Sequence, residues 1–163
     1  MRNIIVITIL AALLTSCGII ERRNPSDPNT NAESIYASSK LGSILALTAI
    51  GGDDTDKKVD TALSILRRID EVVIPLLGDA EGELNGYVYD VIIDALPPEY
   101  ALLIEPALDV FNAHYKLPNI ENPLTSEQKL YLKAFTMGLR DGAIAILRNN
   151  GVLNVEYTFR RVE

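Results

Sequence analysis

The sequence predicts a mainly α-helical protein, a compact bundle of about five helices followed by a short C-terminal β-strand or hairpin. The 163-residue chain, long enough for one domain, is 48% hydrophobic but only 6% aromatic and contains no Trp. Such an aliphatic composition favours packed helices over an aromatic-rich β-sandwich. Apolar residues recur at spacings of three and four along much of the chain, whereas the last residues alternate between apolar and polar.

Residues 1–16 have the layout of an export signal. Arg2 precedes the apolar run Ile4–Leu14, which only Thr8 interrupts. Because a helix rises about 1.5 Å per residue, this run covers about half of the ~30 Å hydrocarbon core and is too short to span it comfortably. A basic residue, a short apolar run and then small residues are typical of a secretory signal peptide.

The only cysteine, Cys17, directly follows this segment. The sequence Leu14-Thr15-Ser16-Cys17 resembles the lipobox of bacterial lipoproteins, although Ser16 stands where Gly or Ala is commoner. The resemblance covers residues 1–17 alone. It implies that the Cys17 sulfur carries a diacylglyceryl (palmitate-type) anchor and that cleavage before Cys17 makes it the first mature residue. An ordinary signal peptide or apolar anchor with a coincidental cysteine is the alternative.

The expected location is the cell envelope. Two or three acyl chains hold a protein stably at a membrane, whereas one chain holds it only marginally. Gly18 follows the cysteine, where lipoproteins retained in the inner membrane often carry Asp. In a host with two membranes, the resemblance therefore implies an outer-membrane protein that faces the periplasm.

The expected organisation has three parts: a signal peptide over residues 1–16, the lipidated Cys17 and a flexible tether over 17–33, and a helical domain over 34–163. From Glu21 to Glu33 the sequence is rich in Pro, Asn and charged residues and lacks apolar periodicity. Such a composition is typical of a linker.

Two helices are expected next. Residues 34–50 are apolar on nearly every side, which predicts a buried helix; a second membrane insertion is the alternative. Apolar spacing then predicts a helix over about 55–77, with Asp54 or Thr55 as its N-cap. Pro75 is expected to kink or end its last turn.

Residues 84–96 fit one face of a helix, but the β-forming stretch YVYDVII leaves a strand open. Helix is favoured. Pro97-Pro98 ends this element, and Pro98 suits the first turn of the next helix, which is expected to reach Leu117. Pro106 lies inside that helix, where it predicts a kink.

The last predicted helix begins after Thr125 and runs to about Asn149. Thr125 and Gln128 have the spacing of a capping box, and Gly151 provides a left-handed terminus. Gly138 and Gly142 lie on one helix face and allow another helix to approach closely. Charged residues between them argue against a membrane dimer, so a contact within the domain is expected.

The C-terminal segment alternates, with Val155, Tyr157 and Phe159 on one side. This pattern predicts a β-strand. A single strand needs an edge with which to pair, and either residues 87–93 or a partner chain would provide it. These three side chains are therefore the predicted contact with a protein partner.

The sequence offers no strong catalytic or metal-binding pattern. His114 is the only histidine, and Cys17 is assigned to lipid, which excludes a His–Cys metal site. Glu99, Glu105 and Asp109 share a predicted helix, so a carboxylate-based hydrolase is a weak alternative. The acidic loops GGDDTD and GDAEGE offer oxygen ligands but do not match a Ca²⁺-binding loop. No catalytic residue, metal or cofactor is predicted.

The predicted function is non-enzymatic: an envelope lipoprotein that binds another protein or acts as a structural or assembly factor. Helix 34–50, the Gly138/Gly142 face and the C-terminal segment are the expected contact surfaces. A formal net charge of −7 and the absence of a basic patch argue against nucleic-acid binding. The alternatives are a small-ligand or lipid carrier with a cavity between helices, and a phage or plasmid exclusion lipoprotein.

Overall fold

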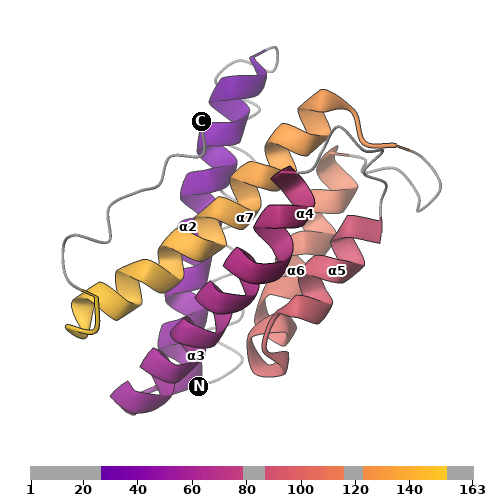
Figure 1. Ribbon diagram of the computed structural model, residues 1–163. Helices are drawn as coiled ribbons and strands as arrows, with labels where there is room; N and C mark the ends of the chain where they lie inside the picture. The colour runs from indigo at the N-terminus through magenta and orange to yellow at the C-terminus, as the bar shows by residue number, and fades with distance from the viewer. Residues whose placement is uncertain (1–26, 79–86, 116–122, 154–163) are drawn as a thin grey trace.

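The computed structural model describes residues 27–78, 87–115 and 123–153 (Figure 1). These residues are mostly helical and contain no β-strand, which confirms the mainly α-helical class. The predicted strand around residues 155–159 lies outside the described residues. The elements are α2 (Pro28–Gly51), α3 (Thr55–Arg68), the π-helix η1 (Ile69–Val73), α4 (Ile74–Gly78), α5 (Tyr87–Ala95), α6 (Pro98–Tyr115) and α7 (Ser126–Asn149).

Helix α7 is the central element of the bundle. It crosses α2 and lies beside α3 (Figure 1), and it packs most extensively against α2. Half of its residues are buried, among them Leu132, Leu139 and Leu147. Helix α2 also contacts α3 and α6, whereas α5 packs against η1 and α6. The hydrophobic core therefore forms around α7.

Both ends of α7 have the predicted local structure. The Thr125 hydroxyl accepts a hydrogen bond from the Gln128 amide at 3.2 Å, and the Gln128 side chain accepts one from the Thr125 amide at 2.9 Å. This capping box satisfies two backbone donors at the helix start. At the other end Gly151 has φ 71° and donates to the Arg148 carbonyl, while Val152 donates to the Leu147 carbonyl. These bonds form a Schellman motif.

Helix α2 starts earlier than expected, which corrects the boundary of the predicted tether at residue 33. The Asp27 side chain caps the helix by accepting hydrogen bonds from the Asn29 amide and the Thr30 hydroxyl, and Pro28 occupies the first turn. An Asp cap followed by Pro is a helix-start signal. Because Asn31 is buried, this first turn belongs to the folded domain.

The predicted helix over residues 55–77 contains a π turn. Asp54 is its N-cap and accepts a hydrogen bond from the Lys57 amide at 3.0 Å. At the other end of the segment, the Ile74 amide donates to the Ile69 carbonyl, so the helix widens over η1 before it continues as α4. Pro75 has no N–H to donate and its ring crowds the preceding turn. A widened turn accommodates this and lets the helix continue.

Residues 87–95 form helix α5, so the favoured helix is confirmed and the strand alternative is wrong. Val88, Ile92 and Ala95 are buried and lie on one face of the helix. Packing of this face against η1 and α6 outweighs the β-propensity of the sequence. Residues 87–93 consequently offer no strand edge to the C-terminal segment. Helix α6 begins at Pro98 and continues through Pro106 to Tyr115.

Helices α2 and α7 approach most closely at Gly138 and Gly142. A Cβ atom on Gly138 would lie 2.5 Å from the Tyr36 carbonyl oxygen and 2.9 Å from the Lys40 nitrogen, while one on Gly142 would lie 2.8 Å from the Lys40 carbonyl oxygen. Only glycine fits at these positions. The contact within the domain is confirmed, and the expectation that this face meets a partner is wrong because α2 covers it.

We predict that Gly138→Ala destabilises the domain, by about 1–3 kcal/mol, because the added methyl group meets backbone atoms that cannot rotate away. The free energy of unfolding is measured by urea titration followed by far-UV circular dichroism. Gly78→Ala is the control, since a Cβ there meets no atom within 4 Å. Equal stability of Gly138→Ala and the wild type would show that the crossing is looser than described.

Candidate functional site

The residues that the sequence singles out for function lie beyond the described ranges. They are the predicted lipid-attachment residues Leu14, Thr15, Ser16 and Cys17 and the predicted partner-contact residues Val155, Tyr157 and Phe159. The described residues show instead what lies between these two ends: a helical domain whose buried polar groups gather along the contact between α2 and α7.

One chain of polar contacts runs from α2 through α7 to η1. The Tyr36 hydroxyl donates a hydrogen bond to Asp141 Oδ2 at 2.5 Å. Arg140 Nη1 lies 3.6 Å from Asp141 Oδ1, and the same guanidinium donates to both carboxylate oxygens of Asp70, at 2.6 and 3.2 Å. Asp141 is buried, so this series of polar contacts places a carboxylate in the interior with a hydrogen-bond donor and a cation beside it.

Burial and the neighbouring Asp141 carboxylate keep the Tyr36 hydroxyl protonated. Burial, and then the hydrogen bond to Asp141 and its charge, raise the pKa of Tyr36 to about 12. Lys40 Nζ lies 5.7 Å from the centre of the Tyr36 ring, a cation–π distance. At neutral pH the phenol is therefore a hydrogen-bond donor. A raised pKa is the opposite of what activates a nucleophile.

Two further tyrosines connect α2 to its neighbours. The Tyr100 hydroxyl donates to Ser43 Oγ at 2.7 Å, and Ser43 Oγ donates to the Leu139 carbonyl at 2.9 Å. Asn31 Nδ2 donates to the Tyr131 hydroxyl at 3.1 Å, which in turn donates to Glu127. Burial raises the pKa of both tyrosines. The three neutral tyrosines thus join helices, Tyr36 and Tyr100 as donors and Tyr131 as the acceptor of the bond from Asn31.

The acids considered for catalysis do not converge. Glu99, Glu105 and Asp109 are all exposed on α6, and the Glu99 carboxylate lies 2.9 Å from Lys57 Nζ. His114 also falls within α6. Of the loop GGDDTD, Asp54 caps α3, whereas most of GDAEGE lies outside the described residues. In the part of the chain that the structure describes, no three His, Cys, Asp or Glu residues form a group that could hold a metal ion.

The polar chain was missed in the sequence because its members are far apart. Tyr36 and Asp141 are separated by 105 positions, and neither belongs to a local motif. A signal was nevertheless present: Arg140 and Asp141 stand between two glycines that predict close helix packing. Charged residues at such a contact need partners from the opposing elements.

We predict that Tyr36→Phe lowers the free energy of unfolding by about 1–2 kcal/mol at pH 7, since the buried Asp141 carboxylate loses a hydrogen bond. The folded-state pKa of Tyr36 lies above the ordinary tyrosine value of 10. Its contribution is therefore complete below about pH 10 and is lost as the pH rises toward 12. Urea titrations of wild type and variant at several pH values measure this difference.

Asp141→Asn provides the matched control for that prediction. It removes the acceptor charge while it keeps the shape of the side chain. If the two groups act through their shared bond, the double variant loses less stability than the two single variants added together. Two results would contradict the role given to this bond. One is that the losses of unfolding free energy in the two single variants add exactly in the double variant. The other is that the difference in unfolding free energy between the wild type and Tyr36→Phe stays constant to the highest pH.

No helix among the described residues combines the length and the apolar character needed to cross a membrane. Comparison of the chain with protein-family models, with curated proteins and with solved structures gives no match.

Proposed function

We propose that the chain is a lipid-anchored protein of the bacterial cell envelope, held through Cys17, whose helical domain binds another protein without catalysing a reaction. The observation that carries the anchor is the sequence Leu14-Thr15-Ser16-Cys17 directly after an apolar run. Cys17 is the only cysteine, so no disulfide within the chain competes for its sulfur. Gly18 favours the outer membrane in a host that has two membranes.

The start of α2 supports a partner close to the lipid surface. The helix begins at Pro28, so the ten residues 18–27 separate the anchor from the domain. Ten residues span at most about 35 Å when fully extended. The start of α2 would stay within this distance of the membrane, and the partner would be a membrane-associated protein or a soluble envelope protein close to the membrane.

The internal packing narrows the surface that is free for a partner. The Gly138/Gly142 face and the inner side of α2 cover each other, so neither is available for a partner. The segment with Val155, Tyr157 and Phe159 stays the proposed contact. Because the described residues provide no strand with which it could pair, addition to a strand of the partner is the favoured mode.

Replacement of Cys17 tests the anchor. For the wild type we expect recovery in the membrane fraction, with a mass that corresponds to cleavage before Cys17 and to added lipid. Cys17→Ser should lose both properties. The control Cys17→Ser/Ser26→Cys restores a thiol outside the lipobox and should behave like Cys17→Ser. A wild-type protein that stays soluble at full precursor length would overturn the proposal.

Crosslinking in intact cells tests the contact. Replacement of Val155, Tyr157 and Phe159 by Ser should abolish the main crosslinked species, because pockets for alternate side chains give strand addition its specificity. The control Glu156→Ala/Thr158→Ala changes the other side of the segment and should retain this species. Recovery of the same species from both variants would exclude the segment as the partner contact.

A further inference from the structure

The end of α7 carries a reactive pair of residues, Asn150 and Gly151. An asparagine followed by glycine deamidates readily, because glycine has no side chain to hinder attack of its backbone nitrogen on the asparagine amide. The chain contains this pair twice, at residues 85–86 and 150–151. Residues 85–86 lie outside the described residues, so the structure bears on Asn150 alone.

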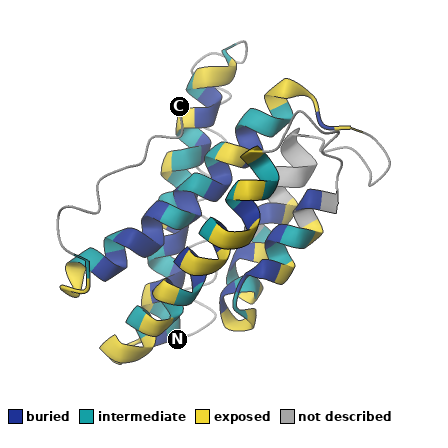
Figure 2. Cartoon of the chain, in the orientation of Figure 1, coloured by how far each residue is buried: buried dark blue, intermediate teal, exposed yellow. Residues whose placement is uncertain are grey.

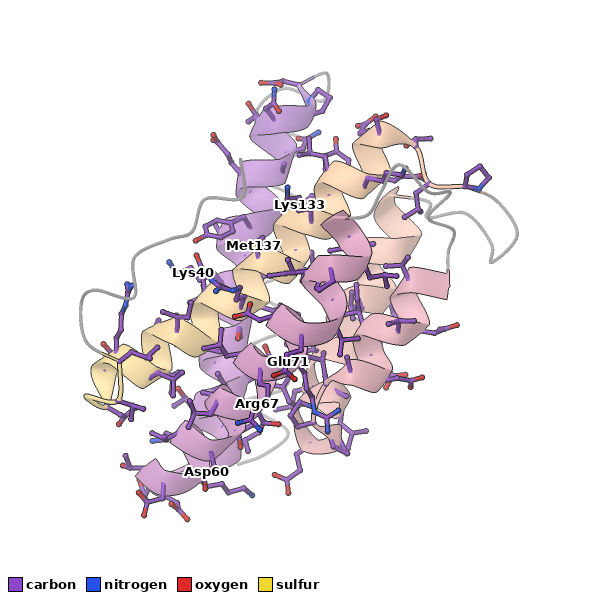
Figure 3. The ribbon with its side chains drawn as sticks, viewed as in Figure 1. Lys40, Asp60, Arg67, Glu71, Lys133 and Met137 are labelled. Atoms are coloured by element: carbon purple, nitrogen blue, oxygen red, sulfur yellow. The ribbon has the colours of Figure 1, made fainter. Side chains whose placement is uncertain are left out.

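Water can reach the pair at the end of α7. Asn149, Asn150 and Gly151 are all exposed, and Figure 2 shows the exposed tip where the helix ends. Lys133 and Met137 lie on the first half of α7 (Figure 3), whereas the last turn lies beyond the crossing with α2, at the edge of the bundle. Burial therefore does not protect Asn150 from a reaction that ends in hydrolysis.

Deamidation at such a pair follows a cyclic path. The backbone nitrogen of Gly151 forms a bond to Cγ of Asn150, and its proton leaves with the side-chain amide nitrogen as ammonia. Water then adds to one of the two carbonyl carbons of the resulting succinimide and opens the ring. The product is aspartate or isoaspartate, in which the backbone continues through the side-chain carbon. In sum, an amide and water give a carboxylate and an ammonium ion.

The Schellman motif holds the reacting atoms apart. Asn150 has ψ 11°, which places the Gly151 nitrogen on the same side of the Cα–C bond as the Asn150 nitrogen, whereas ring closure requires it to turn toward Cβ. The Gly151 N–H donates to the Arg148 carbonyl at 3.0 Å, and Asn150 Nδ2 donates to the Ile146 carbonyl at 2.8 Å. Rotation about this torsion would break the backbone bonds of the motif. The reaction therefore requires that the end of α7 opens first.

The product cannot restore the cap. A carboxylate has no N–H to donate to the Ile146 carbonyl, and its charge lies at the negative end of the α7 macrodipole. Isoaspartate also lengthens the backbone by one atom, which displaces Gly151 from the position in which its φ of 71° closes the motif. The end of α7 that has reacted thus cannot close again in the same form.

We propose that Asn150 is a site of spontaneous deamidation that the Schellman motif controls. The folded domain reacts only while the end of α7 is open, and the reaction then makes this opening permanent. The proposal does not rest on the proposed function, because it needs no lipid, partner or enzyme.

Peptide mapping of the full-length chain by mass spectrometry tests the proposal. At mildly alkaline pH we expect Asn150 to deamidate at least about tenfold more slowly in the folded chain than in guanidinium chloride, because the reaction waits for a local opening. The unfolded chain carries its own reference, since Asn85 and Asn150 should then react at similar rates. Equal rates at Asn150 in the folded and the unfolded chain would overturn the proposal.

Hydrogen exchange of the Gly151 amide measures the same opening independently. This N–H must leave the Arg148 carbonyl before it can exchange, just as it must before it can attack Asn150. We expect the factor by which folding slows deamidation to match the protection factor of this amide within about threefold. A protected amide beside an Asn150 that deamidates at the unfolded rate would contradict control by the motif.

Asn150→Asp copies the aspartate product and tests the loss of the cap. Asn149→Asp is the matched control, since it adds the same charge at the adjacent exposed residue and leaves the donor to the Ile146 carbonyl in place. We expect Asn150→Asp to lower the melting temperature more than Asn149→Asp does. Equal lowering in the two variants would show that charge alone acts and would refute the loss of the cap bond.

Discussion

The close crossing of α2 and α7 is the contact on which the rest of the structure depends. At Gly138 and Gly142 the two backbones meet with no side chain on α7 between them. This proximity lets the Ser43 hydroxyl reach the Leu139 carbonyl, and Tyr100 of α6 then donates to the same hydroxyl. A third helix is thus bonded to the same hydroxyl that joins the first two.

Polar bonds give this crossing its register. Small residues pack closely but fit one another in several positions along a helix, so packing alone specifies the axial position weakly. Three hydrogen bonds at different positions along the two helices remove this freedom: Asn31 to Tyr131, Tyr36 to Asp141 and Ser43 to the Leu139 carbonyl. Because buried polar groups are costly without partners, sliding by one turn would leave several of them unpaired.

Local signals predicted the helices well and their mutual contacts poorly. The Thr125 capping box and the Gly151 terminus involve residues within a few positions of each other, which a sequence displays directly. The start at Pro28 was missed because Pro and Asn also form loops, and only burial of Asn31 distinguishes the two. Bonds such as Tyr36 to Asp141 depend on which faces meet in space. The anchor and partner residues lie outside the described ranges and stay predictions.

The π turn at η1 makes the helical segment from Thr55 to Gly78 respond to the loss of a residue differently from α7. A π turn holds one residue more than the α-helical path requires, so loss of one residue there leaves a continuous helical path in which the Pro75 ring crowds the preceding turn. In α7 a similar loss between Gly138 and Gly142 would rotate one glycine away from α2 by about 100°. Loss of a residue in the segment from Thr55 to Gly78 is therefore felt locally, at Pro75, whereas loss of a residue in α7 breaks its contact with α2.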